Sequence, residues 1–492
     1  MNKNKELLDY IYNERWCNFK NEITNNQVED IILESKEFDN GKKLFILGKA
    51  VIKNNSPQYF IMPLTVEKID GVKSIKYNGK EYYDALKSPT YWSSLMKEIT
   101  LDKDFILPNG YKLFYQSWDG LDFIVKHIDD ISQPLGAEQS NSTLIVGNNV
   151  FAFKQQRVIE FVELANPEVE MNYNLMKTKC KVVPKTYGHL SLINANGESA
   201  FVGIVQEFVP NNGDLWEVSK EKLLDLLDDT YVSNTDVIPL SKYKKLYELM
   251  HLVGKRTNDL LLCLSSFSGN KTLNTQSITL NYIKQYRQSL NDFMLVTREN
   301  IKSNINRISS DMALNIHEAL QNWEKYVSKF LRANFASLNK RKNKGILMRV
   351  HGDFHLGQAI ETKSGDIKFI DFAGEPNLSF KDRKEKRSYM YDIAGMYRSI
   401  SGYLPVVVAK HFATNEKGEV NNEKLLWATA IIKPIIKNLS DAFLNEIDID
   451  KEWFNLEVFR RNLYEINYEI AYRPQMLFIP IDNLKELLLN NK

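Results

Sequence analysis

Cysteine is scarce in this chain, and long apolar runs are absent. Its 492 residues include three cysteines, Cys17, Cys180 and Cys263, which lie far apart and match no metal-ligand or paired spacing. We expect them to be buried thiols in a reducing compartment. No uninterrupted apolar stretch approaches the ~20 residues of a membrane span, and the first residues lack the apolar core of a signal peptide. The sequence therefore predicts a cytoplasmic protein without a membrane partner.

An excess of charge of one sign is also missing. The 64 basic and 62 acidic residues give a formal net charge of +2, which provides no general attraction to nucleic acid or to an anionic membrane. The basic cluster at 381–387 includes Asp and Glu, so we interpret it as a solvated surface run and not as a nucleic-acid patch. The composition, 43% hydrophobic and 26% charged, is typical of a globular protein. We expect a small-molecule partner and favour a monomer, although the sequence leaves the oligomeric state open.

The glycine-rich phosphate loop of the P-loop NTPases is absent as well. No G-x-x-x-x-G-K-[ST] motif occurs, and the Ser-Gly-Asn-Lys-Thr segment at 268–272 lacks the first glycine. A P-loop NTPase is therefore not expected.

Two segments carry the strongest chemical signal. The first, 350–358, holds Asp353 and Gln358 after an apolar strand, and the second, 369–376, holds Asp371 after another. Asp353 is suited to accept the proton of an attacking hydroxyl, while Gln358 and Asp371 offer oxygen ligands to Mg²⁺. Two turn-capping aspartates are the simpler alternative for either segment alone. The combination predicts phosphoryl transfer, with a catalytic loop facing a metal loop.

A kinase also needs a cation for the nucleotide phosphates and an acid that holds it. Residues 143–154 are typical of a β-hairpin ending at Lys154, and Glu170 follows in a segment where Pro167 can start a helix. We expect Lys154 and Glu170 to form an ion pair. The turn before the hairpin offers N–H groups and hydroxyls to phosphates, although Ser and Asn favour turns regardless. Its candidate phosphate-binding residues are Gln139, Ser140, Asn141 and Ser142.

A hinge for the adenine base is predicted at 206–209. An apolar strand stops there, before Pro210. The backbone carbonyl of Glu207 and the amide of Val209 are the groups expected to pair with an adenine edge. An ordinary strand-to-helix connector explains this stretch equally well, so both interpretations stay open.

Patterning along the chain predicts an α+β protein with two or three domains. Residues 1–95 combine a helical segment with short alternating runs, and residues 96–209 contain the hairpin and the hinge. Residues 210–492 are mainly helical, interrupted by the two loops. The long amphipathic segments lie around 241–264, 278–300, 303–334, 424–446 and 452–473.

Together these residues resemble the bacterial maltokinases, ATP-dependent enzymes of the aminoglycoside-phosphotransferase-like, protein-kinase-like fold. The likeness extends over nearly the whole chain, and its most specific segments are 351–358, 371–376, 392–399 and 464–474. The resemblance implies a bilobal fold. Its parts would be an N-terminal α+β cap subdomain (1–95), a β-rich N-lobe (96–209) and a mainly helical C-lobe (210–492).

The resemblance also implies a reaction and a substrate site. ATP and Mg²⁺ are the implied cofactors, and the implied reaction is phosphorylation of the anomeric hydroxyl of maltose to maltose 1-phosphate, in glycogen- or trehalose-linked metabolism. Asp353 is then the base, with Gln358 and Asp371 on the metal. The residues implied at the sugar are His355, Glu375, Arg398, Tyr464, Glu465 and Tyr468.

The last long helical segment has the chemistry of a sugar site. Tyr464, Tyr468 and Tyr472 are four residues apart and share one face, and Glu465 and Glu469 form the adjacent stripe. A sugar needs an aromatic face for stacking and carboxylates for its hydroxyls. A tyrosine stripe alone is more often part of a core, but the resemblance favours a ligand role for Tyr464 and Glu465.

The chain departs from the family at three positions near the predicted acceptor site. Ala373 replaces a usual acidic residue, and Tyr389 and Tyr391 stand where Pro and Arg are usual. We expect these changes to affect the identity of the acceptor more than the reaction. Glucosamine, or another small sugar or aminoglycoside-like compound, is the alternative acceptor. A nucleotide-binding accessory protein without turnover is the alternative from another class.

Overall fold

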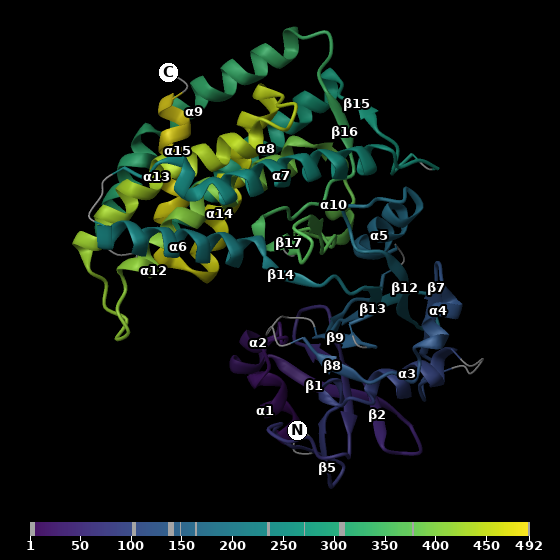
Figure 1. Cartoon of the computed structure of the whole chain (residues 1–492). Coiled ribbons are helices and arrows are strands. Elements are labelled where there is room, and N and C mark those ends of the chain that lie inside the picture. Colours follow the sequence, from purple (N-terminus) through teal and green to yellow (C-terminus); the bar gives the residue numbers. More distant parts are fainter. Residues whose placement is uncertain are drawn as a thin grey trace. The chain divides into compact units, whose positions relative to one another are not determined.

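The computed structural model describes residues 5–100, 105–135, 142–147, 149–162, 165–233, 237–269, 271–304, 310–375 and 378–490. The chain forms two compact units. The first comprises Met1–Lys177 and Pro184–Pro210, and the second comprises Thr178–Val183 and Asn211–Lys492. Strands dominate the first unit and helices the second (Figure 1).

One sheet of the first unit is formed near the N-terminus. Its strands run in the order β1 (Val28–Phe38), β2 (Lys43–Ile52), β3 (Gln58–Thr65), β5 (Lys80–Asp84) and β4 (Ile75–Tyr77), and β11 (Val158–Ile159) also pairs with β3. The helices α1 (Lys5–Asn13) and α2 (Lys20–Thr24) precede it. Asp39, Asn40 and Gly41 turn the chain between β1 and β2 with positive φ, a conformation that these residue types tolerate best.

The second sheet of this unit contains the predicted hairpin. Its order is β6 (Phe105–Ile106), β7 (Lys112–Ser117), β12 (Thr186–Ile193), β13 (Ser199–Glu207), β10 (Phe151–Gln155), β9 (Ser142–Val146) and β8 (Ser132–Pro134). Strands β9 and β10 pair with Lys154 opposite Thr143, which confirms the hairpin. Helices α3 (Tyr91–Thr100), α4 (Leu121–Lys126) and α5 (Pro167–Lys177) complete the unit. The predicted helix start at Pro167 is confirmed.

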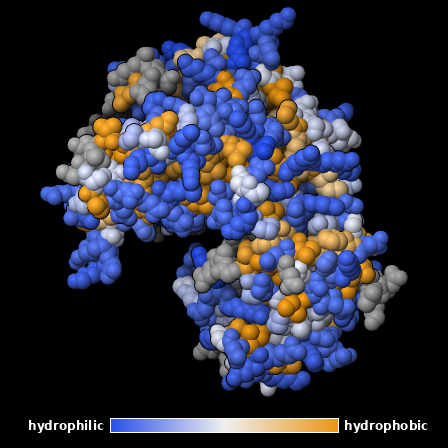
Figure 2. Space-filling view, in the orientation of Figure 1, coloured by the Kyte–Doolittle hydropathy of each residue, from blue (hydrophilic) through white to orange (hydrophobic). Residues whose placement is uncertain are grey.

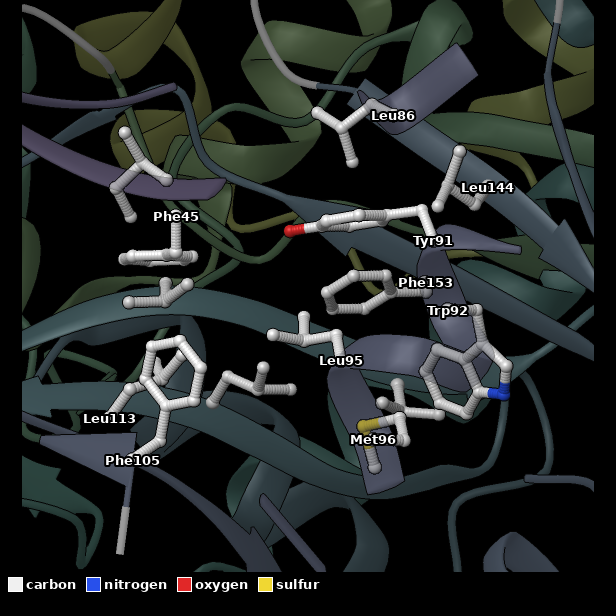
Figure 3. Close-up of a cluster of buried hydrophobic side chains, with 14 of the residues drawn as sticks. Phe45, Leu86, Tyr91, Trp92, Leu95, Met96, Phe105, Leu113, Leu144 and Phe153 are labelled. Carbon is white, nitrogen blue, oxygen red and sulfur yellow. The ribbon is translucent and has the colours of Figure 1, made fainter. Parts of the chain in front are cut away.

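The two sheets share one hydrophobic core. Phe45 and Leu47 of β2 and Tyr91 and Trp92 of α3 are buried in the same cluster as Phe153 of β10. Figure 3 shows side chains from both sheets and from α3 meeting in this core. Residues 1–95 therefore do not form a compact unit apart from the strands that follow. The reason is that the inner face of the N-terminal sheet is covered by α3 and by the second sheet.

The second unit is built mainly from helices. Its helices are α6 (Leu215–Ser233), α7 (Leu240–Ser265), α8 (Leu280–Asn304), α9 (Ser310–Lys340), α10 (Phe380–Arg383), α11 (Met390–Arg398), α12 (Leu404–Ala413), α13 (Asn422–Leu444), α14 (Lys451–Tyr472) and α15 (Phe478–Asn490). The five long helices predicted by amphipathic patterning are confirmed as α7, α8, α9, α13 and α14. A π-helical turn, η4 (Ser399–Tyr403), joins α11 to α12.

Two small sheets lie among these helices. They are β14 (Asn211–Asp214), β17 (Ala359–Thr362) and β18 (Ile367–Phe369), and β15 (Gln276–Ser277), β16 (Ile346–Met348) and β19 (Arg387–Ser388). The short helix η3 (Leu356–Gln358) precedes β17. These strands deliver the two predicted loops, because β16 leads into residues 350–358 and β18 leads into Asp371.

The segment Thr178–Val183 belongs to the second unit, although the predicted boundaries place it in the N-lobe. Cys180 forms a disulfide with Cys263 of α7, with 5.8 Å between the Cα atoms. The Phe369 amide also donates to the Val182 carbonyl at 2.8 Å. The expectation of three free thiols is therefore wrong for Cys180 and Cys263, because the fold brings together residues that are 83 positions apart. Cys17 is a buried free thiol as expected.

Polar residues cover most of the molecular face drawn in Figure 2, with apolar residues in scattered groups. Among the described residues, no helix combines the length and the apolar character required to cross a membrane. The buried apolar side chains are gathered inside each unit instead.

Candidate active site

The predicted catalytic loop (350–358) follows β16 and is held by a carboxylate of α11. The backbone amides of His351 and Gly352 donate to Asp392 Oδ2 and Oδ1 at 2.7 and 2.9 Å. Burial raises the pKa of Asp392 to about 7, although the two amide donors act in the opposite direction. Gly352 has a φ of +88°, which favours glycine at this turn. Asp392 therefore fixes the backbone that presents Asp353.

His351 connects the catalytic loop to the predicted metal loop. Its side chain is buried, and Nε2 lies 2.9 Å from the Ile370 carbonyl, which can only accept a hydrogen bond. Nε2 therefore carries the proton. Burial lowers the pKa of His351, so the ring is neutral near pH 7. The ring also lies 4.6 Å from that of Phe372, between centroids.

The predicted metal ligands Gln358 and Asp371 are brought together by backbone pairing. The Ile370 amide donates to the Gln358 carbonyl at 2.9 Å, at the end of the β17–β18 hairpin. Asp371 has a φ of +65°, a left-handed conformation that costs free energy for a residue with a side chain and is concentrated at functional sites. One carboxylate and one amide, completed by phosphate oxygens and water, form a set of the kind that binds Mg²⁺. The arrangement fits the predicted metal loop.

The Asp353 carboxylate is largely buried and lies near the side chains of a histidine and an arginine. Its Oδ2 lies 3.8 Å from His355 Nε2, and its Oδ1 lies 3.8 Å from Arg461 Nη1 of α14. Burial alone raises the pKa of Asp353, but His355 and Arg461 together lower it below its ordinary value. Asp353 is therefore ionised at neutral pH, as a proton acceptor must be.

A cavity of about 620 Å³ in the second unit opens onto Asp353. Its volume suits a small organic ligand. The side chains around it combine carboxylates, arginines and aromatic rings. The lining residues are Asp214, Trp216, Asp353, His355, Gly357, Gly395, Ser399, Tyr403, Arg461, Tyr464, Glu465, Tyr468, Glu469, Tyr472 and Arg473.

Four of the predicted sugar residues line this cavity, namely His355, Tyr464, Glu465 and Tyr468. Two others lie behind its wall. Arg398 is buried and donates to Glu465 Oε2 through Nε at 3.1 Å and Nη2 at 2.7 Å. Glu375 is buried and pairs with Arg461 at 3.2 Å. Both are therefore supports of the wall and not lining residues, because their charges are directed toward α14.

Seven lining residues with charged or aromatic side chains are not among the predicted site residues. On α14, Glu469 and Tyr472 lie on the glutamate and tyrosine stripes that helical spacing predicts, and Arg461 lies three positions before Tyr464, so the same spacing could have found it. Arg473 follows at the end of the same face and pairs with Glu469 at 2.7 Å. Asp214, Trp216 and Tyr403 come from distant elements and carry no signal in the sequence. Their place in the cavity depends on how β14, α6 and η4 pack.

In the first unit, the structure gives Lys154 a partner other than the predicted one. Lys154 Nζ lies 3.0 Å from Glu168 Oε1, and both side chains are largely buried. Glu168 and Glu170 point to roughly opposite sides of α5, since successive helical residues are about 100° apart. Glu168 is therefore an acid that pairs with Lys154 here, and the pairing with Glu170 stays a prediction.

The other predicted nucleotide residues are placed only in part. Ser142 begins β9, and its hydroxyl accepts from Arg157 Nε at 3.0 Å. Glu207 ends β13, and its amide donates to the Lys185 carbonyl at 2.7 Å. Val209 is buried. Gln139, Ser140 and Asn141 lie outside the described residues, and the adenine-binding role of the hinge stays a prediction.

No protein-family model matches the chain, but solved structures do. A glucosamine kinase in complex with glucosamine, ADP and inorganic phosphate matches with a TM-score of 0.57 and 16% identity over 94% of both chains. Another crystal form of a glucosamine kinase matches with a TM-score of 0.59, 16% identity and coverage of 94% of this chain and 95% of that chain. A spectinomycin phosphotransferase matches at a TM-score of only 0.33. The chain therefore has the bilobal kinase-like α+β fold that the sequence predicts.

Proposed function

We propose that this protein is an ATP-dependent kinase that phosphorylates a hydroxyl group of a small sugar, with an amino sugar as the favoured acceptor. The observation that carries the proposal is the cavity in which Asp353, an ionised and largely buried carboxylate, faces a wall of tyrosines and carboxylates. A sugar hydroxyl placed beside Asp353 can transfer its proton to that carboxylate as it attacks the γ-phosphoryl group.

The proposed binding site for ATP and Mg²⁺ uses residues of the two loops and of β10. Gln358 and Asp371 would hold Mg²⁺, which when bound neutralises the developing charge on the phosphates. Lys154, held by Glu168, would contact the nucleotide phosphates. His351 and Asp392 keep the loops in register, so that the base and the metal ligands stay at fixed positions.

The charge of the cavity supports a cationic acceptor. Asp214, Asp353, Glu465 and Glu469 supply four carboxylates against the guanidinium groups of Arg461 and Arg473, a difference of 4 − 2 = 2 negative charges. Adding the supporting pair Glu375 and Arg398 leaves this difference unchanged. An ammonium group would be attracted to such a site, whereas a neutral sugar gains only hydrogen bonds and stacking. The glucosamine bound to the similarly folded kinase is consistent with this preference.

Maltose is the second candidate acceptor. Tyr464 and Tyr468 lie 6.2 Å apart between ring centroids, and Tyr468 and Tyr472 lie 4.8 Å apart, so α14 presents a continuous aromatic face. Such a face, in a cavity of about 620 Å³, has room for more than one sugar ring. The resemblance to maltokinases supports the same acceptor.

The test is ADP release with Mg²⁺ and ATP over a panel of glucosamine, maltose, glucose, trehalose and an aminoglycoside, with Asp353→Asn as the blank. Turnover confined to glucosamine or the aminoglycoside supports the amino-sugar proposal. Turnover with maltose and none with amino sugars replaces it by the second candidate. Silence on every sugar, together with measurable ATP binding, would favour an accessory protein without turnover.

A further inference from the structure

We propose that Arg461 is a positioning residue for phosphoryl transfer, which holds the Asp353 carboxylate in place and couples it to Glu465 of the acceptor wall. This inference rests on the proposed function, because Asp353 must be the proton acceptor for it to matter.

One guanidinium group lies among three carboxylates. Arg461 Nη1 is 3.2 Å from Glu375 Oε1 and 3.8 Å from Asp353 Oδ1, and Arg461 Nε is 3.3 Å from Glu465 Oε1. The arginine side chain is 12% exposed, and part of it lines the cavity. Because a guanidinium group is planar and rigid, it fixes the relative positions of the carboxylates that it contacts. Arg461 therefore connects the base to the acceptor wall by a stiff link.

His355 and Arg461 both lower the pKa of Asp353, and Arg461 is the one of the two whose side chain is always charged. His351 and His355 face Asp353 from its own loop, Asp392 faces it from α11, and Tyr464 faces it from α14. His351 is neutral near pH 7, and Asp392 adds negative charge when it is ionised. The segment 351–358 contains no Lys or Arg. Arg461 is thus the permanent cation beside the base.

Through Glu465, Arg461 also affects the position of the acceptor. Glu465 is held from behind by Arg398 at 2.7 Å and from the side by Arg461 at 3.3 Å. A sugar group that bonds to Glu465 is therefore placed at a fixed offset from Asp353. Loss of Arg461 should disturb this offset and leave the buried carboxylates without their shared cation.

The experiment compares Arg461→Met and Arg461→Lys with the wild type, on the acceptor that gives turnover. We expect Arg461→Met to lower kcat by about 10²-fold while KM for ATP stays unchanged, since misplaced reacting groups lose rate and not nucleotide affinity. Added guanidinium ion should restore part of the rate. Arg461→Lys keeps the positive charge but loses the planar geometry of the guanidinium group. Its kcat should therefore lie between those of the wild type and Arg461→Met.

The pH profile separates this role from a purely structural one. Arg461 lowers the pKa of Asp353, so its removal should raise that pKa. Because the base works only when ionised, the acid limb of kcat/KM should move to higher pH in Arg461→Met.

Arg460 is the matched control. It is the next residue, is also 12% exposed, and pairs with Glu375 and Glu457. In Arg460→Met, the acid limb of kcat/KM should stay at the wild-type pH, even if thermal unfolding shows that this variant loses as much stability as Arg461→Met.

Two outcomes would overturn the proposal. Wild-type kcat and an unmoved acid limb in Arg461→Met would show that Asp353 does not depend on this arginine. An equal fall in rate and an equal shift in Arg460→Met would assign the effect to structure alone. If the wild type releases no ADP with any acceptor, the proposed function fails first and this inference with it, so the two failures are distinguishable.

Discussion

At the scale of single residues, the site concentrates charge where solvent is excluded. Asp353 and His351 lie in one loop, Asp392 supports that loop, and each of the three has a shifted pKa. Burial dominates at Asp392 and His351, whereas neighbouring donors dominate the net shift at Asp353. The same loop therefore presents an ionised Asp353 beside a neutral His351.

Replacement of Asp353 with Asn should abolish turnover while nucleotide binding persists. The amide cannot accept the hydroxyl proton, and general-base catalysis contributes about 10²–10⁴-fold. ADP release and nucleotide titration measure the two effects. Asp366→Asn is a control, because Asp366 pairs with Arg256 at 2.6 Å on the turn between β17 and β18. An Asp353→Asn enzyme with the wild-type rate would show that another group is the base.

Replacement of Asp214 with Asn should reduce discrimination in favour of amino sugars. Asp214 lines the cavity and contributes to its surplus negative charge, so its neutralisation should lower kcat/KM for a charged acceptor by about tenfold, equivalent to one charged hydrogen bond. Asn can still accept from the Glu217 amide, which now bonds to Asp214 at 3.0 Å, so the start of α6 is kept. Asp225→Asn, at an exposed position of the same helix, is the matched control. An equal loss for glucose and glucosamine would contradict the charge argument.

At the scale of elements, α11 and α14 supply many of the residues that support and line the site. α11 provides Asp392, which holds the loop of Asp353, and Arg398, which supports the cavity wall, and α14 provides Arg461 and most of the tyrosines and glutamates of the cavity. These two helices pack against each other. Displacement of either helix would therefore move Asp353 and the cavity wall together.

The stability of this assembly should depend on pH through Asp392. Its pKa is about 7 in the folded chain and 3.8 ordinarily, so the folded state binds the proton more tightly. The stabilisation from this group is full below its unfolded pKa and is lost as pH rises through about 7. Asp392→Asn does not titrate, and it should lose less stability than the wild type between about pH 5 and about pH 8. Urea unfolding at both pH values measures this, and equal losses in the two proteins would refute it.

At the scale of the whole molecule, the core shared by the two sheets of the first unit contains residues from both sides of the predicted cap boundary. Phe45 and Leu47 from the N-terminal sheet are buried with Phe153 and Val205 from the second sheet. The N-terminal sheet therefore belongs to the same compact unit as the second sheet.

Deletion of residues 1–95 should consequently abolish folding of the first unit. The deletion removes Tyr91, Trp92 and Leu95 from the shared core and exposes the apolar face of the second sheet. We expect an aggregating protein with a disordered first unit, as measured by solubility and near-UV circular dichroism. A soluble fragment 96–492 that binds ATP would show that the cap is separable after all.

The sequence by itself determined the local features of this protein. The hairpin ending near Lys154, the helix start at Pro167, the long helices and the two loops around Asp353 and Asp371 were all predicted correctly. Each of these depends on residue types at short spacing, where turn chemistry and periodicity act within one element.

Only the tertiary structure decided which distant side chains meet. It placed Asp214, Trp216 and Tyr403 in the cavity, paired Lys154 with Glu168, and joined Cys180 to Cys263. It also placed Arg398 and Glu375 behind the cavity wall, where they pair with Glu465 and Arg461. The physical reason is that these outcomes depend on the rotation and packing of whole helices and sheets, which are set by burial over long sequence separations and leave no mark on local spacing.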